Sequence, residues 1–74
     1  MPGYSQRMIQ ITVNGEARSL ADGLCLDALV EQLGLPPDRV AIEHNRRVIR
    51  RFQWPAVRLS EGDQIEVVQL VGGG

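Results

Sequence analysis

Three glycines at the end of the sequence, Gly72, Gly73 and Gly74, are the residues with the clearest chemical potential. Glycine loses more backbone freedom on ordering than any other residue and packs no side chain, so this run adds nothing to a core. Without Cβ atoms, these residues can pass through a narrow channel and deliver the Gly74 carboxylate to the active site of another protein. Joined to AMP, that carboxylate becomes a mixed anhydride that a sulfur or nitrogen nucleophile can attack. The competing interpretation is a frayed end without a role.

Cys25 and His44 are the only cysteine and the only histidine of the chain. One cysteine cannot form an internal disulfide, and the pair supplies no ligand set, so no metal site is expected. A thiolate at a helix start is favoured by the helix dipole, which makes a persulfide or thioester role conceivable. The interpretation we favour is a small, largely buried residue at a cap position. We interpret His44 as a structural or surface residue.

All eight basic residues are arginines, and the net charge is −1, so the chain lacks the electrostatic footprint of a dedicated nucleic-acid binder. Four of the eight are Arg46, Arg47, Arg50 and Arg51. Guanidinium groups form bidentate bonds to phosphate and carboxylate, so this cluster could meet an acidic partner. The alternative, which we favour for the cluster by itself, is a solvated face at a turn.

Length and hydropathy limit the class of protein. A chain of 74 residues is one small domain, which buries only about 60% of its unfolded surface and leaves little room for a large catalytic cleft. No apolar run approaches the roughly 20 residues that span a bilayer. Residues 1–7 lack the apolar stretch of a secretory signal. We therefore expect a cytoplasmic protein without membrane contact.

The elements that must position the glycine end begin at Met8, and residues 1–7 are expected to be a disordered extension. Apolar and polar residues alternate over Met8–Val13, which predicts a half-buried strand. Asn14-Gly15 is the strongest two-residue hairpin signal, so residues 16–20 should return antiparallel.

A helix follows from Cys25, about nine residues long, because Leu26, Leu29, Val30 and Leu33 recur at spacings of three and four. Gly34 ends it as a C′ residue. Beyond two prolines, residues 40–44 predict a third strand. A tight turn at residues 45–46 then leads to a short edge strand at residues 47–49.

Phe52 and Trp54 are interpreted as core residues that fix an irregular crossing segment before Pro55. A glycine turn at residues 61–64 then leads into the last strand, predicted over residues 65–71 and expected to be the longest. Ile65 and Val67 would face the core.

This order of elements predicts an α+β protein with a β-grasp fold: a mixed four- to five-stranded sheet with one main helix packed on one face. The first and last strands lie side by side in the middle and run parallel, so the helix supplies the crossover that joins them. Residues 8–71 form the domain, and residues 72–74 form a flexible tail that projects from its end.

The second sheet face has no helix to cover it, so Val68 and Leu70 should be exposed beside the tail. A small apolar patch on a monomer often marks an interface. We expect partners to bind this face, with Arg46 and Arg47 adding electrostatic steering. The alternative is ordinary strand composition without a binding role.

Six features together resemble the ThiS family, the sulfur carriers of thiamine biosynthesis, which have a ubiquitin-like β-grasp fold. They are the Asn14-Gly15 hairpin, Gly23-Leu24-Cys25-Leu26 at the helix start, Val40-Ala41-Ile42 leading to Asn45, the stretch ending at Trp54, Glu61-Gly62-Asp63-Gln64-Ile65, and the terminal Gly73-Gly74. The resemblance covers residues 8–74. It departs from the family at Cys25, where these carriers often have a threonine cap, and in the extra Gly72.

The resemblance implies a protein substrate rather than an enzyme. An E1-like adenylyltransferase of the ThiF type uses ATP to adenylate Gly74, and a sulfur donor such as a cysteine desulfurase supplies the sulfur of a thiocarboxylate. Thiazole synthase, of the ThiG type, then takes the sulfur. Gly73 would give clearance in the channel and Gly72 would lengthen the reach. No cofactor would be bound by the carrier.

Three alternatives stay open at the level of sequence. The small subunit of molybdopterin synthase is similar in fold, tail and activation but serves another acceptor enzyme. A ubiquitin-like modifier would be joined through Gly74 to lysines of other proteins. A plain interaction module would have an idle tail, which could be removed without loss of function.

Overall fold

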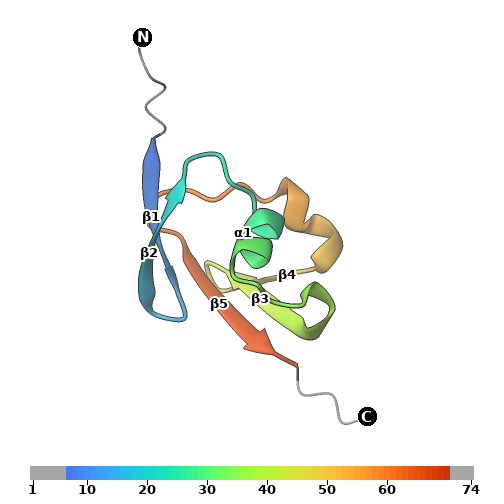
Figure 1. Cartoon of the computed structure of the whole chain (residues 1–74). Coiled ribbons are helices and arrows are strands. Elements are labelled where there is room, and N and C mark those ends of the chain that lie inside the picture. The colour runs from blue at the N-terminus through green and yellow to red at the C-terminus, as the bar shows by residue number, and fades with distance from the viewer. Residues whose placement is uncertain (1–6, 71–74) are drawn as a thin grey trace.

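The computed structural model describes residues 7–70 and has a five-stranded mixed sheet with one α-helix on one face (Figure 1). The strand order is β2-β1-β5-β3-β4. This confirms the predicted α+β, ubiquitin-like β-grasp architecture. The strands are β1 (Met8–Val13), β2 (Glu16–Ala21), β3 (Val40–His44), β4 (Arg47–Ile49) and β5 (Gln64–Gln69), the helix is α1 (Leu26–Gln32), and two 3-10 helices are η1 (Pro37–Arg39) and η2 (Arg51–Ala56).

Two tight turns set the registers of the two hairpins. Asn14 and Gly15 have φ angles of 51° and 82°, the positive values that a type I′ turn requires, so the β1–β2 hairpin forms as predicted. Asn45 and Arg46 also have positive φ, 51° and 72°, at the turn between β3 and β4. An arginine seldom adopts this conformation. The Asn45 side chain supports the turn, because its Oδ1 accepts a hydrogen bond from the Gln64 N–H at 2.8 Å.

Helix α1 is shorter than the predicted nine residues, because the two outermost residues are its caps. Cys25 is the N-cap, with extended backbone angles, and Leu33 is the C-cap. Gly34 follows with a φ of 69°, which confirms it as the C′ residue that ends the helix. Leu26 and Leu29 are completely or almost completely buried. The predicted apolar face of the helix therefore packs on the sheet.

The first and last strands are parallel neighbours in the middle of the sheet, as expected. Strand β5 begins at Gln64, one residue before the predicted start, and it is no longer than β1 or β2. Val71, the predicted end of the strand, lies outside the described residues. β5 also pairs antiparallel with β3 from Ile65 to Gln69.

A single core lies between α1 and the sheet, and Trp54 belongs to it. The Trp54 indole N–H donates a hydrogen bond to the Ile49 carbonyl at 3.0 Å, and the side chain is 3% exposed. Phe52 is 78% exposed, so its predicted place in the core is wrong. A 3-10 helix has three residues per turn, and residues two positions apart in η2 face different directions. The core residues are Ile9, Ile11, Val13, Leu20, Leu26, Leu29, Val30, Val40, Ile42, Trp54, Leu59 and Ile65.

The two ends predicted to lie outside the domain, residues 1–7 and 72–74, fall almost entirely outside the described residues. Arg7 is the exception, and it takes part in the hairpin. Its carbonyl accepts a hydrogen bond from the Asp22 N–H at 2.8 Å. Strand pairing begins at Met8, the predicted domain boundary, and one backbone hydrogen bond of the hairpin extends to Arg7.

Candidate functional site

Strand β5 leads from the middle of the sheet directly to the glycine end. The Leu70 N–H donates to the Arg39 carbonyl at 2.7 Å, so pairing with the chain before β3 continues one residue beyond β5. Gly72, Gly73 and Gly74 lie outside the described residues. Core contacts of Ile65 and the ladder with β3 hold β5 in place as far as Leu70, the last described residue.

The sheet face opposite α1 is the face we call the open face, defined by Ala41, Glu43, Val48, Glu66, Val68 and Leu70. Val68 lies directly opposite Ala41 on the neighbouring strand. Val68 and Leu70 are 54% and 51% exposed, which confirms the exposure expected for both. Apolar side chains half exposed next to the glycine end are available for a partner protein.

Two carboxylates face each other on the same open face. Glu43 of β3 and Glu66 of β5 are direct cross-strand neighbours. Like charges in this position disfavour the pairing of the strands. Arg46 lines the shallow depression that contains both glutamates, and Val48 lies opposite Glu43 on β4 with 69% exposure. The open face thus combines an apolar end, beside the tail, with a charged end.

Neither predicted arginine lies beside Val68 and Leu70. Arg46 lies at the charged end of the open face, whereas Arg47 precedes Val48 on β4 and so falls on the opposite face of the sheet. Arg46 and Arg47 are exposed, but the turn that holds them packs against Gln64, where β5 begins. Tail and arginine pair are therefore at opposite ends of β5. The arginine opposite Leu70, the last described residue, is Arg39, which sequence reasoning missed. The sequence carries no signal for it, because only the register between β3 and β5 places Arg39 opposite Leu70.

A buried carboxylate, Asp63, joins the elements on which the site is built. Its Oδ2 lies 2.7 Å from His44 Nε2 and accepts the Ser60 N–H at 2.9 Å, while its Oδ1 accepts the Asn45 side-chain N–H at 3.1 Å. Its carbonyl accepts the Thr12 N–H at 3.0 Å. This network confirms the structural interpretation of His44.

Opposing effects act on the pKa of Asp63. Burial raises the pKa, but hydrogen bonds from His44, Asn45 and the Ser60 N–H, together with the charge of His44, outweigh it and leave the pKa below its ordinary value. Asp63 is therefore an ionised acceptor at neutral pH. Its partners are all groups of this chain, so we assign it to the fold and not to chemistry.

Cys25 has the cap position that the sequence predicted, but its side chain does not cap. The thiol forms no cap hydrogen bond and lies 4.0 Å from the Gly23 carbonyl, and the residue is partly rather than largely buried. The backbone around it is fixed instead, because the Leu26 N–H donates to the Val57 carbonyl at 2.9 Å. None of the contacts described for the thiol involves a base that would activate it.

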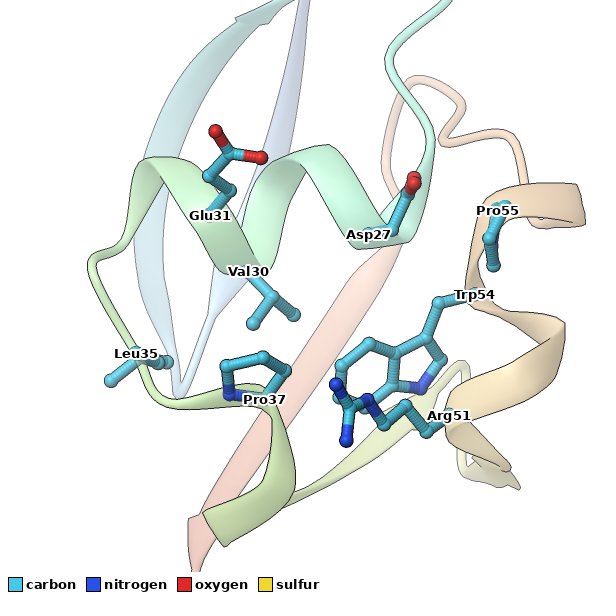
Figure 2. A pocket seen from close by; sticks show the side chains of 8 residues that line it. All are labelled: Asp27, Val30, Glu31, Leu35, Pro37, Arg51, Trp54 and Pro55. Atoms are coloured by element: carbon cyan, nitrogen blue, oxygen red, sulfur yellow. The ribbon is translucent and has the colours of Figure 1, made fainter.

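A cavity of about 370 Å³ lies on the helix side of the sheet, away from the open face. Figure 2 shows Val30, Pro37 and the Trp54 indole turned toward this space. Asp27 and Arg51 stand at its rim with opposite charges. None of the residues predicted to take part in function lines this cavity.

Residues 7–70 contain no group of three or more histidine, cysteine, aspartate or glutamate side chains that could hold a metal ion. In the same range, no helix is long and apolar enough to cross a membrane.

Comparison with known proteins adds a family to this geometry. The model of the ThiS family matches residues 11–74. The sulfur carrier protein ThiS of Escherichia coli is 33% identical over 66 residues, which cover 89% of this chain and all of that protein. The crystal structure of the thiamine biosynthesis protein ThiS from Geobacter metallireducens superposes with a TM-score of 0.79 at 29% identity, covering 89% of this chain and all of that one.

A longer protein also contains a similar region. Thiazole synthase of Magnetococcus marinus is 44% identical over 66 residues, or 89% of this chain. The chain spans only 20% of the length of that enzyme. A region with the sequence pattern of this chain thus occurs within a polypeptide named for thiazole synthesis.

Proposed function

The chain belongs to the ThiS family, and we propose that it is a sulfur carrier of thiamine biosynthesis in which Gly74 bears the sulfur. The observation that carries this proposal is the extent of the family match, which runs to residue 74 and so includes the glycine end. The alignment with the ThiS protein of Escherichia coli along its full length supports the same role. The chain is then a protein substrate of enzymes and not itself a catalyst.

Activation of Gly74 follows from the chemistry of carboxylic acids. A carboxylate is a poor electrophile, so a partner enzyme of the E1-like, ThiF type transfers AMP from ATP to it and releases pyrophosphate. The outer sulfur of a persulfide, supplied by a donor such as a cysteine desulfurase, attacks the acyl carbon and AMP leaves, which gives an acyl disulfide. A thiol then attacks the donor's cysteine sulfur, so that the S–S bond breaks, a disulfide forms on the donor and the thiocarboxylate is released. ATP is bound by the activating enzyme, and the carrier itself binds no cofactor. The thiocarboxylate that results keeps sulfur covalently attached and nucleophilic.

The three glycines give the carboxyl group access to enclosed active sites. Gly73 has no side chain to obstruct a narrow channel, and Gly72 extends the part of the chain that can enter it. The fold anchors the strand that leads to these glycines, since Ile65 fixes β5 in the centre of the sheet. The folded domain is therefore the part that partner enzymes bind, and the short glycine end is the part that reacts.

Thiazole synthase is the acceptor that we propose for the sulfur. The Magnetococcus marinus relative, named thiazole synthase, includes a region 44% identical to this chain. A carrier domain and a synthase that exist in one polypeptide elsewhere are expected to come into contact for this chain as well. The carrier must bind the synthase in either arrangement, joined or separate, because the carboxyl group of Gly74 has to reach the site where the thiazole forms.

The open face is the surface that we propose for partner docking. Val68 and Leu70 provide exposed apolar area beside the tail. Arg46 and Arg47, at the far end of β5, steer partners by charge rather than touching the tail. A partner that contacts both ends of this face would hold β5 along its length and so fix the direction in which Gly74 leaves the domain.

Activation of a chain with an altered end tests this function. Removing Gly74, or adding one residue after it, should abolish ATP-dependent adenylation by the activating enzyme, measured as exchange of pyrophosphate into ATP. Circular dichroism and the urea midpoint should stay unchanged, because the core lies within residues 9–65. Normal adenylation of the extended chain would contradict the proposal.

A further inference from the structure

Strand β5 is central in the strand order, yet β1 covers only its first part. β1 and β5 pair at Thr12–Gln64 and at Val13–Ile65. The chain then turns at Asn14 into β2, and Figure 1 shows β5 diverging from this hairpin on its way to the C-terminal end. On its other side, β5 keeps β3 as a neighbour as far as Gln69. Within residues 7–70, the second half of β5 therefore has a strand on one side only.

The hydrogen-bond pattern identifies the backbone groups on the free side. The Leu70 N–H donates to the Arg39 carbonyl and the Gln64 carbonyl accepts from the Asn45 N–H, so the even-numbered residues of β5 direct their groups toward β3. Val67 and Gln69 must then direct theirs toward the side of β1, since successive residues of a strand alternate.

Asn14 satisfies the first backbone group on this free side, the Val67 N–H. Its side-chain oxygen accepts the Val67 N–H at 2.8 Å. Within residues 7–70, no strand pairs with the next two groups, the Val67 carbonyl and the Gln69 N–H. An exposed pair of this kind is a template for another strand.

A groove of about 490 Å³ runs beside this edge on the helix side. Leu33, Leu35 and Val67 give it an apolar lining and are themselves only partly buried. Glu16 and Arg18 of β2 stand at the same groove and are exposed. A strand placed on the edge of β5 would point alternate side chains into this groove and toward the open face next to Val68.

We propose that an extended segment of thiazole synthase adds to the free edge of β5 as a further strand of the sheet. Its backbone N–H bonds the Val67 carbonyl, its backbone carbonyl accepts the Gln69 N–H, and an apolar side chain between them packs against Leu33 and Leu35. Main-chain bonds give this mode its affinity, and the groove gives it selectivity for the side chain. The identity of the occupant rests on the proposed function.

Thiazole synthase is chosen as the occupant because a thiazole synthase polypeptide of Magnetococcus marinus contains a region similar to this chain, and the position of the edge suits an enzyme that acts on Gly74. Five residues follow Gln69 up to Gly74, and fully extended they span at most about 18 Å. A segment bound at Gln69 thus holds the reactive carboxyl group within that distance of its own polypeptide. The edge and the open face are two sides of the same strand, so one partner can contact both.

The test compares two substitutions at Gln69, each titrated against thiazole synthase from the same organism. Gln69→Pro removes the N–H on the free side and leaves the ladder with β3 intact, because proline is tolerated at a strand edge. Gln69→Ala keeps the N–H. One lost hydrogen bond together with the bulk of the ring should weaken binding by about tenfold more in Gln69→Pro than in Gln69→Ala. Equal affinities of the two variants would overturn the proposal.

Amide hydrogen exchange followed by NMR gives a second readout that does not depend on a variant. In the unmodified chain saturated with thiazole synthase, exchange of the Gln69 amide should slow markedly. A Gln69 amide that exchanges as fast as in the free carrier would overturn strand addition, even if Gln69→Pro weakens binding. Binding with no effect at Gln69 contradicts this inference alone, whereas failure of the unmodified chain to bind thiazole synthase contradicts the proposed acceptor as well.

Discussion

Asp63 connects segments that are far apart in the sequence through one side chain and one carbonyl. Its carboxylate accepts from His44, Asn45 and the Ser60 N–H, and its carbonyl accepts from Thr12 of β1. No local pattern indicates this role, because Asp63 follows a glycine turn and its histidine partner is 19 residues away. Such a network depends on the tertiary fold and has no local pattern from which to predict it.

Replacing Asp63 by alanine should lower the free energy of unfolding by about 2–3 kcal/mol at neutral pH, because three buried or partly buried donors lose a charged acceptor. Urea denaturation of the variant and the unmodified chain measures the difference. Asp63→Asn is the matched control, since it keeps the shape and loses the charge, and it should fall between the two. A single hydrogen bond contributes at least about 0.5 kcal/mol. A loss smaller than this would show that the network does not stabilise the fold.

The same residue predicts a pH dependence. The pKa of Asp63 is lower in the folded chain than its ordinary value of 3.8. The stability that its ionised form contributes is therefore complete above that value and is lost as the pH falls through the lower, folded pKa. The difference in urea midpoint between the unmodified chain and Asp63→Ala should shrink in this acid range. A difference that is the same at neutral and strongly acid pH would contradict the charge-based account.

Cys25 is a cap residue whose side chain makes no cap bond, so a better capping residue should improve the helix. Cys25→Thr should raise the free energy of unfolding by about 0.5–1 kcal/mol, because its hydroxyl can accept the N–H of Asp27 or Ala28. Sulfur transfer to Gly74 should continue in this variant. Mass spectrometry after incubation with the activating enzyme and the sulfur donor measures this transfer. A folded Cys25→Thr or Cys25→Ser chain that accepts no sulfur would show that the thiol is catalytic.

At the scale of elements, the sequence predicted what local chemistry determines. Asn14-Gly15 produced its hairpin and Gly34 ended its helix, because the residue types themselves favour the positive φ values observed. Prediction was wrong for Phe52, where an irregular segment has no periodicity to show which aromatic faces the core. η2 buries Trp54 and leaves Phe52 exposed.

The role of the open face in partner binding can also be tested at the level of elements, by a substitution at Val68. Val68→Asp should weaken binding of the activating enzyme and of thiazole synthase by about 2 kcal/mol each, as the loss of an interface anchor does. The fold should persist, because Val68 is already 54% exposed. Phe52→Asp is the control, as it changes an exposed apolar residue outside the open face. Unchanged affinity of Val68→Asp for both enzymes would remove this face from the account.

At the scale of the whole molecule, the topology could be predicted because few arrangements satisfy its constraints. Two parallel strands need a crossover, one helix can supply it, and the last strand must then leave from the middle of the sheet. The relations between distant surfaces could not be predicted in the same way. Arg46 and Arg47 lie at the end of β5 opposite to Leu70, which only the register between β3 and β5 determines.

The partial cover of β5 is a second feature that lies beyond the sequence. The parallel neighbours β1 and β5 were expected, but the length of their contact depends on where the hairpin diverges. That divergence leaves Gln69 with an unpaired side next to Leu33 and Leu35. The same central strand is thus a structural element along its first half and a candidate recognition element along its second.

The central claim, that Gly74 carries sulfur, is tested most directly by the intact mass of the chain purified from its own host. The account predicts a population whose mass corresponds to replacement of one carboxyl oxygen by sulfur, with fragmentation placing the change on Gly74. Iodoacetamide should add one more alkyl group to the sulfur-carrying population than to the rest of the chains. Any alkylation of Cys25 affects both populations equally. A chain that ends in an unmodified carboxylate during active thiamine synthesis, or that is joined through Gly74 to lysines of other proteins, would contradict it.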